Sequence, residues 1–318
     1  MREVLLTGNP DIDTIMEYLL EGSGKMLRPR LVYLTSSFYP HDPEMKKDIA
    51  VAVELIHLAS LVHDDIIDLA MTRRGRDSIN KRWGNQCSVL AGDYLFATAF
   101  KLINRYGQAK VLDSITHTIQ LMCSGEIKQM SMSFNLQSTE EDYLDKTYHK
   151  TACLFASSCK IGALISAMPV NEAVRLEEYG LCLGYAYQII DDILDFVSDS
   201  TILGKPVGSD LLEGNITLPV IYALQSAQYG PMLRELLEPS LDSRKLQNVK
   251  EILLASQAIE YSLSCARSFI KQALRNLKFL PAGPAVEELR ALSFYLMDGY
   301  YRNLNHLSPL TEKEVMEN

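Results

Sequence analysis

The sequence predicts an all-α fold from three observations. Apolar residues recur at helical spacing in the segments 48–71, 89–103, 152–168 and 178–196, whereas the alternation typical of strands is rare. These segments are apolar on most sides, as in helices that lie inside a large helical assembly. No linker, internal repeat or low-complexity segment divides the 318 residues. We therefore expect one all-α domain that spans residues 1–318.

Turn-forming residues delimit the helices in chain order. Gly8 and Pro10 interrupt the first apolar patch. Further breaks, marked by Gly, Pro, Asn, Asp or Ser, fall at 38–43, 104–108, 133–142, 167–172, 203–215, 229–231, 238–243 and 280–284. The helices are thus predicted to be joined by loops at these positions.

Composition excludes several classes of protein. With 47% apolar and 22% charged residues, the chain is typical of a soluble globular protein. A net charge of -9 argues against nucleic acid as the main partner, because phosphate binding needs a basic face. The six cysteines form no CxxC pair and are predicted to be reduced. Neither a signal peptide nor a membrane-spanning apolar run is found, so we expect a cytoplasmic protein whose contact with membranes is at most peripheral.

Acidic residues stand inside an apolar helical segment in "LVHDDIIDLAMTRRG", residues 61–75. Asp64 and Asp68 are four residues apart, so they lie on one helix face, about 6 Å apart along the axis. Carboxylates grouped so closely repel one another in an apolar setting unless cations neutralise them. The arginines that follow, Arg73 and Arg74, suggest that those cations in turn carry an anionic ligand.

The same spacing recurs downstream in "YQIIDDILDF", residues 187–196. Asp191 and Asp195 repeat the pair, and Asp192 repeats the doublet. Two such helices could face each other and share ions. Carboxylate oxygens with room left for water suit Mg²⁺, which binds through a few carboxylates and substrate phosphates. The pattern therefore predicts a magnesium site.

A structural alternative exists for each motif taken alone, because a single acidic triplet is more often a helix cap or a solvated face. A cap needs the acids at a helix start, whereas apolar periodicity begins well upstream of both motifs. An EF-hand loop needs acids at alternate positions with a central glycine, and residues 64–75 lack that pattern. The two copies together favour the metal site.

Basic residues accompany glycines at three places, namely Lys25 and Arg28 in "EGSGKMLRPR", Arg73 and Arg74 in "TRRG", and Lys205 in "GKPVGSD". Arginine binds phosphate oxygens bidentately, and lysine supplies a point charge. Each group alone is more often a solvated surface patch. Beside two metal-binding helices, they favour a diphosphate site.

Five motifs, in order between about Gly22 and Leu224, resemble those of the trans-isoprenyl diphosphate synthase (polyprenyl synthetase) family. "GSGKMLRP" is similar to the family's GGKxxRP, residues 61–75 to its first aspartate-rich motif, and "YHKTACLF" to its KT segment. "YQIIDDILDF" and "GKPVGSDLLEGNITLP" are similar to its second motif and tail. The tail variant is similar to that of the catalytic subunit of heptaprenyl diphosphate synthases, in the long-chain branch.

The resemblance implies an isoprenoid synthase fold, a bundle of helices around a central, largely apolar cavity. It implies a prenyltransferase that joins isopentenyl diphosphate to an allylic diphosphate, head to tail and repeatedly. It also implies three Mg²⁺ ions, two of them held by Asp64 and Asp68 and the third by Asp191, with Asp65, Asp192 and Asp195 in support.

Substrate-binding residues follow from the same resemblance. Isopentenyl diphosphate would be bound by Lys25, Arg28, His57 and Arg74, and the allylic diphosphate by Arg73, Lys150 and Lys205. Thr151 and Gln188 would lie beside the developing allylic cation. A single helix histidine such as His57 is usually a core residue. Its position seven residues before Asp64 favours the role in diphosphate binding.

Two departures from the family pattern stand out. The first glycine pair reads Gly-Ser-Gly, and Asn215 stands where many members of the family have a lysine. The second departure removes a cation near the phosphates. It predicts weaker allylic binding or a branch with a different arrangement.

Two other functions stay open at this point. A class I terpene cyclase shares the first aspartate motif, but its second metal motif differs and it lacks the Lys25 and Arg28 pair. A non-catalytic or partner-dependent subunit would tolerate loss of the aspartates, which are all present. The family implies a homodimer, with a heteromer that includes a small subunit as the alternative. The apolar segment 89–100 is a candidate dimer interface, although a helix buried in the core of its own chain would have the same apolar pattern.

Product length is predicted from Ala59 and Ser60, which lie one turn before Asp64. Members of the family with short products often have aromatic rings there, whereas both residues here are small. We expect a product longer than geranylgeranyl, of heptaprenyl-like length, that stops near Leu121 or Met122. The alternative is that the two residues are small only to let helices pack closely.

Overall fold

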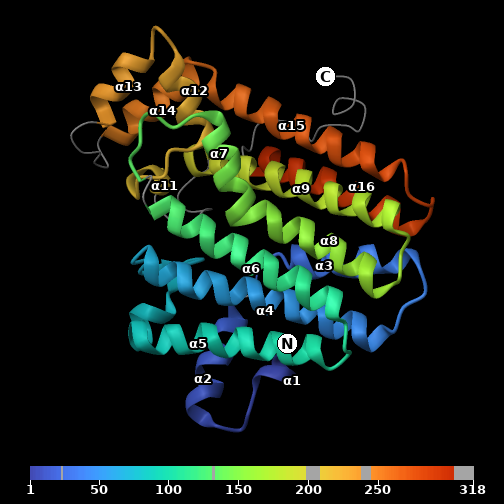
Figure 1. The fold of residues 1–318 in the computed structure, drawn as a ribbon. Coiled ribbons are helices and arrows are strands. Elements are labelled where there is room, and N and C mark those ends of the chain that lie inside the picture. Colours follow the sequence, from blue (N-terminus) through green and yellow to red (C-terminus); the bar gives the residue numbers. More distant parts are fainter. Residues whose placement is uncertain (23, 131–132, 198–207, 238–244, 304–318) are drawn as a thin grey trace. The chain divides into compact units, whose positions relative to one another are not determined.

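The computed structural model describes residues 1–318 except 23, 131–132, 198–207, 238–244 and 304–318. Helices make up nearly all of the regular structure of the described residues, as Figure 1 shows. The strands there are two short ones, β1 (Thr72–Arg73) and β2 (Arg76–Asp77), which form an antiparallel hairpin. The predicted all-α fold is confirmed.

Most of the described loops fall at the breaks expected from the turn-forming residues, but the helix α11 (Ser209–Leu212) lies inside the break predicted at 203–215. Residues 203–207 and 238–243 of the predicted breaks lie outside the described residues. In chain order the helices are α1 (Arg2–Leu5), α2 (Pro10–Glu21), α3 (Leu27–Thr35), η1 (Ser36–Phe38), α4 (Pro43–Ile67), α5 (Ile79–Asn104), α6 (Ala109–Met130), α7 (Glu140–Thr147), η2 (Tyr148–Ala152), α8 (Cys153–Ile165), α9 (Val170–Val197), α11 (Ser209–Leu212), α12 (Leu218–Gln225), α13 (Gly230–Leu237), α14 (Lys245–Ala255), α15 (Ala258–Leu277) and α16 (Pro284–Asn303).

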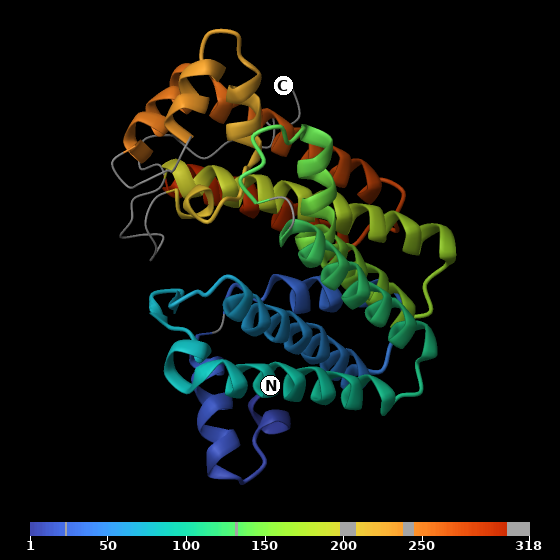
Figure 2. The ribbon, with the colours of Figure 1, turned by 60° about the vertical axis from the view of Figure 1, so that its left-hand side comes forward.

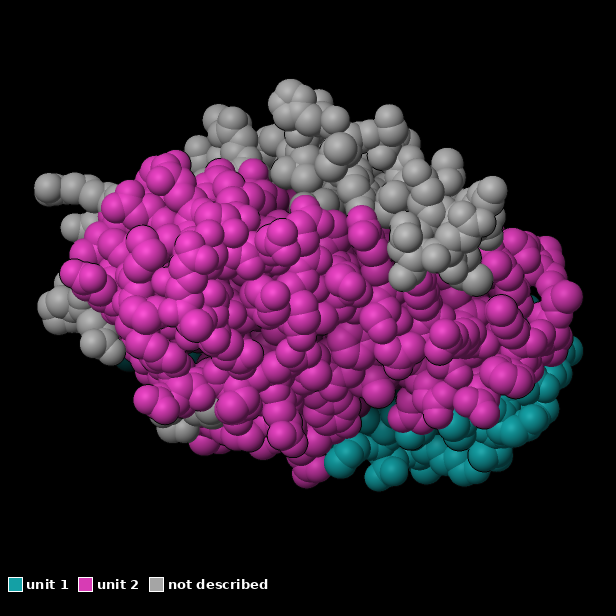
Figure 3. Space-filling view, turned by 90° about the horizontal axis from the view of Figure 1, so that it is seen from above, with its two compact units in different colours: residues 1–117, 157–174 teal, residues 118–156, 175–318 magenta. Residues whose placement is uncertain are grey.

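The chain forms two compact units, which Figure 3 colours separately. Unit 1 consists of residues 1–117 and 157–174, and unit 2 of residues 118–156 and 175–318. The first aspartate motif therefore belongs to unit 1 and the second to unit 2. That both units act as one domain remains a prediction.

In unit 1, the helix α4 carries the first motif at its C-terminal end. It begins where Asp42 accepts the backbone N–H of Glu44 at 2.9 Å and Pro43 occupies the first turn, a favourable start for a helix. Its apolar residues are buried on most sides, and α4 runs alongside α5 in both ribbon views (Figures 1 and 2). The helix ends earlier than the apolar pattern predicted, because Leu69 adopts a left-handed conformation with φ 51°.

In unit 2, the KT segment lies at a distortion between two helices. The helix α7 starts with a capping box in which Thr139 and Asp142 satisfy each other's backbone N–H groups. It runs directly into η2, a π-helical turn over Tyr148–Ala152, which contains Lys150 and Thr151. Such turns are rare and are frequent at functional sites.

A helix that crosses a bilayer needs about 20 predominantly apolar residues. None of the helices among the described residues is long and apolar enough to do so.

Candidate active site

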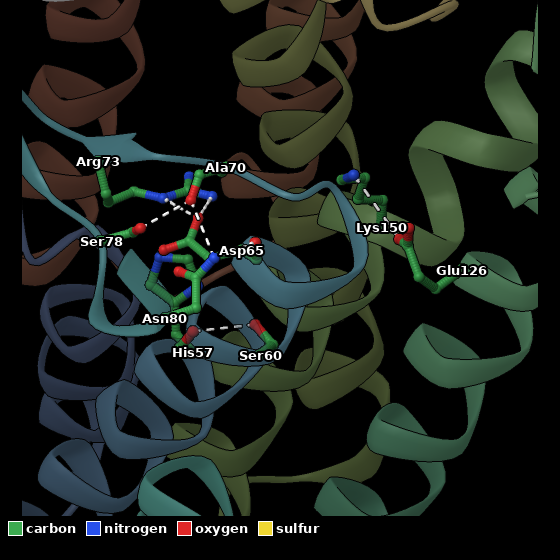
Figure 4. A network of polar contacts seen from close by, with 9 residues as sticks. All are labelled: His57, Ser60, Asp65, Ala70, Arg73, Ser78, Asn80, Glu126 and Lys150. Atoms are coloured by element: carbon green, nitrogen blue, oxygen red, sulfur yellow. Dashed lines mark hydrogen bonds and ion pairs between the residues drawn. The ribbon is translucent and has the colours of Figure 1, made fainter. Parts of the chain in front are cut away.

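In unit 1, the three aspartates at the end of α4 have different surroundings. Asp65 is only 4% exposed, and its Oδ1 atom accepts a hydrogen bond from Arg73 Nε at 2.8 Å and another from Arg73 Nη2. Figure 4 shows the Arg73 guanidinium directed at this carboxylate. Burial raises the pKa of Asp65, and the bonds from Arg73 oppose that rise. Asp65 is therefore engaged by the protein itself.

The loop that carries Arg73 is fixed to the end of α4 by side chains that follow the hairpin. Ser78 Oγ donates to the Ala70 carbonyl at 2.6 Å, and Asn80 Nδ2 donates to the carbonyls of Asp65 at 3.2 Å and Ala70 at 3.0 Å (Figure 4). These bonds hold the hairpin against the helix that bears the motif. Arg73 can thus reach back eight residues to Asp65.

The other two carboxylates of the motif are more accessible. Asp64 is half-buried, and Asp68 is exposed at the C-cap of α4, where its N–H donates to the Asp64 carbonyl at 2.8 Å. The predicted helical register is confirmed. Among the residues that the structure describes, no three His, Cys, Asp or Glu side chains gather into a metal site. Paired carboxylates that leave positions for water and phosphate nevertheless fit the ligand set that Mg²⁺ prefers.

Arg28 on α3 contacts His57, which lies two turns before the motif on α4. Arg28 is 8% exposed, and its Nη1 atom donates to His57 Nε2 at 3.0 Å. The direction is fixed because arginine has no acceptor. Burial, followed by the charges of Arg28, Arg74 and Arg73, holds the pKa of His57 well below its usual value, so the imidazole is neutral and can accept this bond.

The glycines of "GSGK" admit the side chain of Arg74. Arg74 Nη1 donates to the Gly22 carbonyl at 2.6 Å. A Cβ atom at Gly24 would lie 2.5 Å from Arg74 Nη2, so a larger residue there would displace the guanidinium. Lys25, next along the chain, is exposed. Arg28 therefore contacts His57 directly, and the charge of Arg74 acts on His57, whereas Lys25 is exposed.

In unit 2, a chain of hydrogen bonds joins the KT segment to the second aspartate motif. Thr151 Oγ1 donates to Gln188 Oε1 at 2.7 Å, and Gln188 Nε2 donates to Asp192 Oδ1 at 2.8 Å. Tyr143 donates its hydroxyl to the other oxygen of Asp192 at 2.7 Å. Three residues that the sequence associated only by family resemblance are therefore in direct contact.

Close packing brings these groups together. A Cβ atom at Gly184 would lie 2.6 Å from the Cα atom of Ala152, so α9 approaches the π-helical turn more closely than any residue other than glycine allows. Gln188, one turn further along α9, then reaches Thr151. Lys150, which precedes Thr151, is half-buried and lies 3.6 Å from Glu126 Oε2 (Figure 4).

The second motif has two buried aspartates, whereas the first has one. Asp192 is 3% exposed, and burial together with the charge of Asp210 raises its pKa to about 7. Asp195 is 1% exposed and accepts bonds from Ser209 Oγ at 3.0 Å and the Asp210 N–H at 3.2 Å. Asp191 alone of the three is exposed.

The remaining predicted residues are placed as follows. Lys205 lies outside the described residues. Ala59 is fully buried, and Ser60 is half-buried with its Oγ atom donating to the His57 carbonyl at 2.9 Å (Figure 4). Leu121 and Met122 are half-buried in α6.

Sequence reasoning missed three residues of these clusters, namely Glu54, Glu126 and Tyr143. Glu54 is 3% exposed, and burial raises its pKa to about 7 although the charges of Arg28 and Arg74 oppose the rise. Its position inside an apolar segment, three residues before His57, was a usable signal. Glu126 and Tyr143 carry no such signal, because their partners lie on other helices.

Comparison with known proteins identifies the family of this chain. A model of the polyprenyl synthetase family matches residues 9–255. Heptaprenyl diphosphate synthase component 2 of Bacillus subtilis (strain 168) is 38% identical over 298 residues, which are 93% of this chain and 85% of the relative. The crystal structure of heptaprenyl diphosphate synthase from Staphylococcus aureus is 32% identical with a TM-score of 0.88 and covers 95% of each chain. Polyprenyl synthase from Caulobacter crescentus CB15, crystallised with calcium and isoprenyl diphosphate, is 30% identical with a TM-score of 0.87 and covers 93% of this chain and 91% of its own. The chain therefore belongs to the polyprenyl synthetase family of prenyltransferases.

Proposed function

We propose that the protein condenses isopentenyl diphosphate with an allylic diphosphate, head to tail and repeatedly, to make a long-chain all-trans polyprenyl diphosphate with Mg²⁺ as cofactor. The observation that carries this proposal is the division of the six aspartates. Asp65, Asp192 and Asp195 are buried and bonded within the protein, whereas Asp64, Asp68 and Asp191 are accessible, so the first aspartate of each motif is left accessible. The Caulobacter crescentus relative with calcium and isoprenyl diphosphate supports both the divalent metal and the ligand class.

The metal ligands in this proposal are Asp64, Asp68 and Asp191. Mg²⁺ held by these carboxylates would neutralise the charge of the departing pyrophosphate. The proposal includes three Mg²⁺ ions, which the aspartates of the two motifs bind. Asp65, Asp192 and Asp195 hold the motif helices to Arg73, Tyr143 and Ser209.

The basic residues of unit 1 bind isopentenyl diphosphate in this proposal. Arg28 is held by neutral His57, which orients the guanidinium without adding a competing charge. Arg74 is anchored to Gly22, and Lys25 is free to swing toward a phosphate from the surface. Arg73 is shared between Asp65 and the allylic diphosphate.

The residues of unit 2 act on the allylic substrate. Lys150 and Lys205 bind its diphosphate, and the oxygens of Thr151 and Gln188 lie beside the carbon from which pyrophosphate leaves. The allylic C–O bond breaks, and the alkene of isopentenyl diphosphate supplies the electrons of the new C–C bond. The proton lost from the condensed product passes to the pyrophosphate. The product is one five-carbon unit longer and is again an allylic diphosphate.

Chain length in this proposal follows from the small residues Ala59 and Ser60 on α4. They leave room for a growing tail, which Leu121 or Met122 would finally stop. A heptaprenyl-like length is supported by similarity to heptaprenyl diphosphate synthase component 2. A cytoplasmic location, a homodimer and peripheral membrane contact through the product complete the proposal.

A second candidate is a subunit that needs a partner for activity. The relative from Bacillus subtilis is named as component 2 of its enzyme, which indicates a further component there. We propose a heteromer with a small subunit as the alternative to the homodimer.

Incubation with Mg²⁺, isopentenyl diphosphate and farnesyl diphosphate tests the proposal. Chromatography of the dephosphorylated products should show alcohols longer than geranylgeraniol. A cyclic hydrocarbon would indicate a terpene cyclase instead. Elongation that appears only after the small subunit of a related synthase is added would favour the partner-dependent form.

A further inference from the structure

A pocket in unit 2 lies between α6, α7 and the turn that follows α11. Its lining includes Lys128, Lys146, His149 and Asn215. Lys128 is paired with Asp145 Oδ2 at 2.7 Å. Lys146 differs, because no hydrogen bond or ion pair joins its ammonium group to any residue that the structure describes.

Lys146 is nevertheless surrounded by groups of the candidate active site. It lies on α7 four residues before Lys150, hence on the same face of the helical segment, and its Nζ atom is 5.8 Å from the centre of the Tyr143 ring. Burial lowers its pKa, and the charges of Asp192, Asp210 and Glu126 oppose that effect. A half-buried cation near carboxylates, without a direct partner among them, is suited to an anionic ligand.

Asn215 faces the same pocket through a well-defined turn. Its N–H donates to the Asp210 carbonyl at 2.8 Å, and Gly214 precedes it with φ 86°. Many members of the family have a lysine at this position, so the present chain lacks a cation there. Lys146 places one in the same pocket.

We propose that Lys146 binds the diphosphate of the allylic substrate and so supplies the positive charge that is missing at Asn215. The inference rests on the proposed function, since it assigns a further binding residue to that reaction. A purely structural role is the competing explanation. In that case Lys146 would only offset the charges of Asp192 and Asp210, and its loss would affect folding rather than ligand choice.

The experiment measures binding and turnover separately. Binding of farnesyl diphosphate to the full chain with Mg²⁺, without isopentenyl diphosphate, is measured by calorimetry for wild type, Lys146→Met, Lys128→Met and the double variant Lys146→Met with Asn215→Lys. Lys128→Met is the matched control, because Lys128 lines the same pocket but is already paired with Asp145. Thermal unfolding of each variant reports whether it folds.

We expect Lys146→Met to weaken farnesyl diphosphate binding roughly tenfold, as loss of one charge-assisted contact would. Lys128→Met should stay within about twofold of wild type, and Asn215→Lys should restore binding to the Lys146→Met variant. Wild-type affinity in a folded Lys146→Met variant, an equal loss in Lys128→Met, or no restoration by Asn215→Lys would overturn the inference. Absence of elongation by the wild type, with or without a partner subunit, would instead count against the proposed function, while the binding series still decides the role of Lys146.

Discussion

At the scale of single residues, the two aspartate motifs perform two tasks. Asp65, Asp192 and Asp195 are buried and bonded to protein donors, so each fixes the local structure around its motif. Asp64, Asp68 and Asp191 are accessible, and we propose them as metal ligands. Substitutions within one short motif should therefore have opposite signatures in stability and in turnover.

Asp191 and Asp195 provide the clearest comparison, because both belong to α9 and differ in exposure. We expect Asp191→Asn to lower turnover by roughly 10²-fold or more while changing the free energy of unfolding by less than about 0.5 kcal/mol. Asp195→Asn should lower the free energy of unfolding by about 1–3 kcal/mol, because Ser209 and the Asp210 N–H lose a charged acceptor. Product assays and urea unfolding measure both quantities. Near-normal turnover of Asp191→Asn would refute its assignment as a metal ligand.

Glu54 predicts a pH dependence of stability. Its pKa in the folded protein is about 7, against 4.5 for an ordinary glutamate, because burial outweighs the charges of Arg28 and Arg74. Between about pH 4.5 and 7 the folded state retains a proton that the unfolded state has lost, so stability falls as pH rises through this window. The loss from this group is about 3 kcal/mol at most and is complete above pH 7.

The difference between wild type and Glu54→Gln isolates this effect from other carboxylates. Urea unfolding of both proteins is measured at several pH values between 4 and 8. We expect the variant to gain stability relative to wild type as pH rises. A difference that is constant across this range would show that Glu54 ionises normally.

At the scale of elements, the π-helical turn η2 depends on its close contact with α9. Gly184→Ala would place a Cβ atom 2.6 Å from the Ala152 Cα atom, and backbone cannot yield as a flexible side chain can. We expect a loss of about 1–3 kcal/mol in the free energy of unfolding and a lower turnover, because Gln188 would move away from Thr151. Gly283→Ala, which meets no atom within 4 Å, is the control. Equal stability of the two variants would contradict the close approach.

The face of α4 before the first motif should determine product length. Ser60→Phe introduces a ring at a half-buried position and should shorten the main product, as judged by chromatography after dephosphorylation. Ser60→Ala removes only the bond to the His57 carbonyl and should leave the length unchanged. An unchanged distribution in an active Ser60→Phe enzyme would mean that the residue is small for helix packing alone.

The sequence predicted these elements unevenly, for physical reasons. Apolar periodicity located α4, α5, α8 and α9, because it reports burial along a helix directly. The end of α4 at Ile67 was not predictable from that pattern, because it depends on the left-handed Leu69 and the hairpin behind it. The bonds from Tyr143 to Asp192 and from Arg73 to Asp65 depend on tertiary contacts, so spacing identified the aspartates but not which of them would be buried.

At the scale of the whole molecule, the assembly state is open to a direct test. We expect light scattering to give a mass close to twice the 35.8 kDa of one chain, as the proposed homodimer requires. Measurements at several protein concentrations check that the mass is stable. A mass of one chain that doubles only when a small subunit is added would support the partner-dependent form instead.

The interleaving of the two units has a consequence for biosynthesis. Each unit consists of two separate stretches of chain, and residues 118–156 of unit 2 are made before residues 157–174 of unit 1. Because translation proceeds from the N-terminus, unit 1 cannot be completed on the ribosome until residue 174 has emerged, and by then part of unit 2 is already outside. A nascent chain released earlier contains neither unit in full, and the second aspartate motif gains its bonds from Ser209 and Asp210 only after residue 210 has been made.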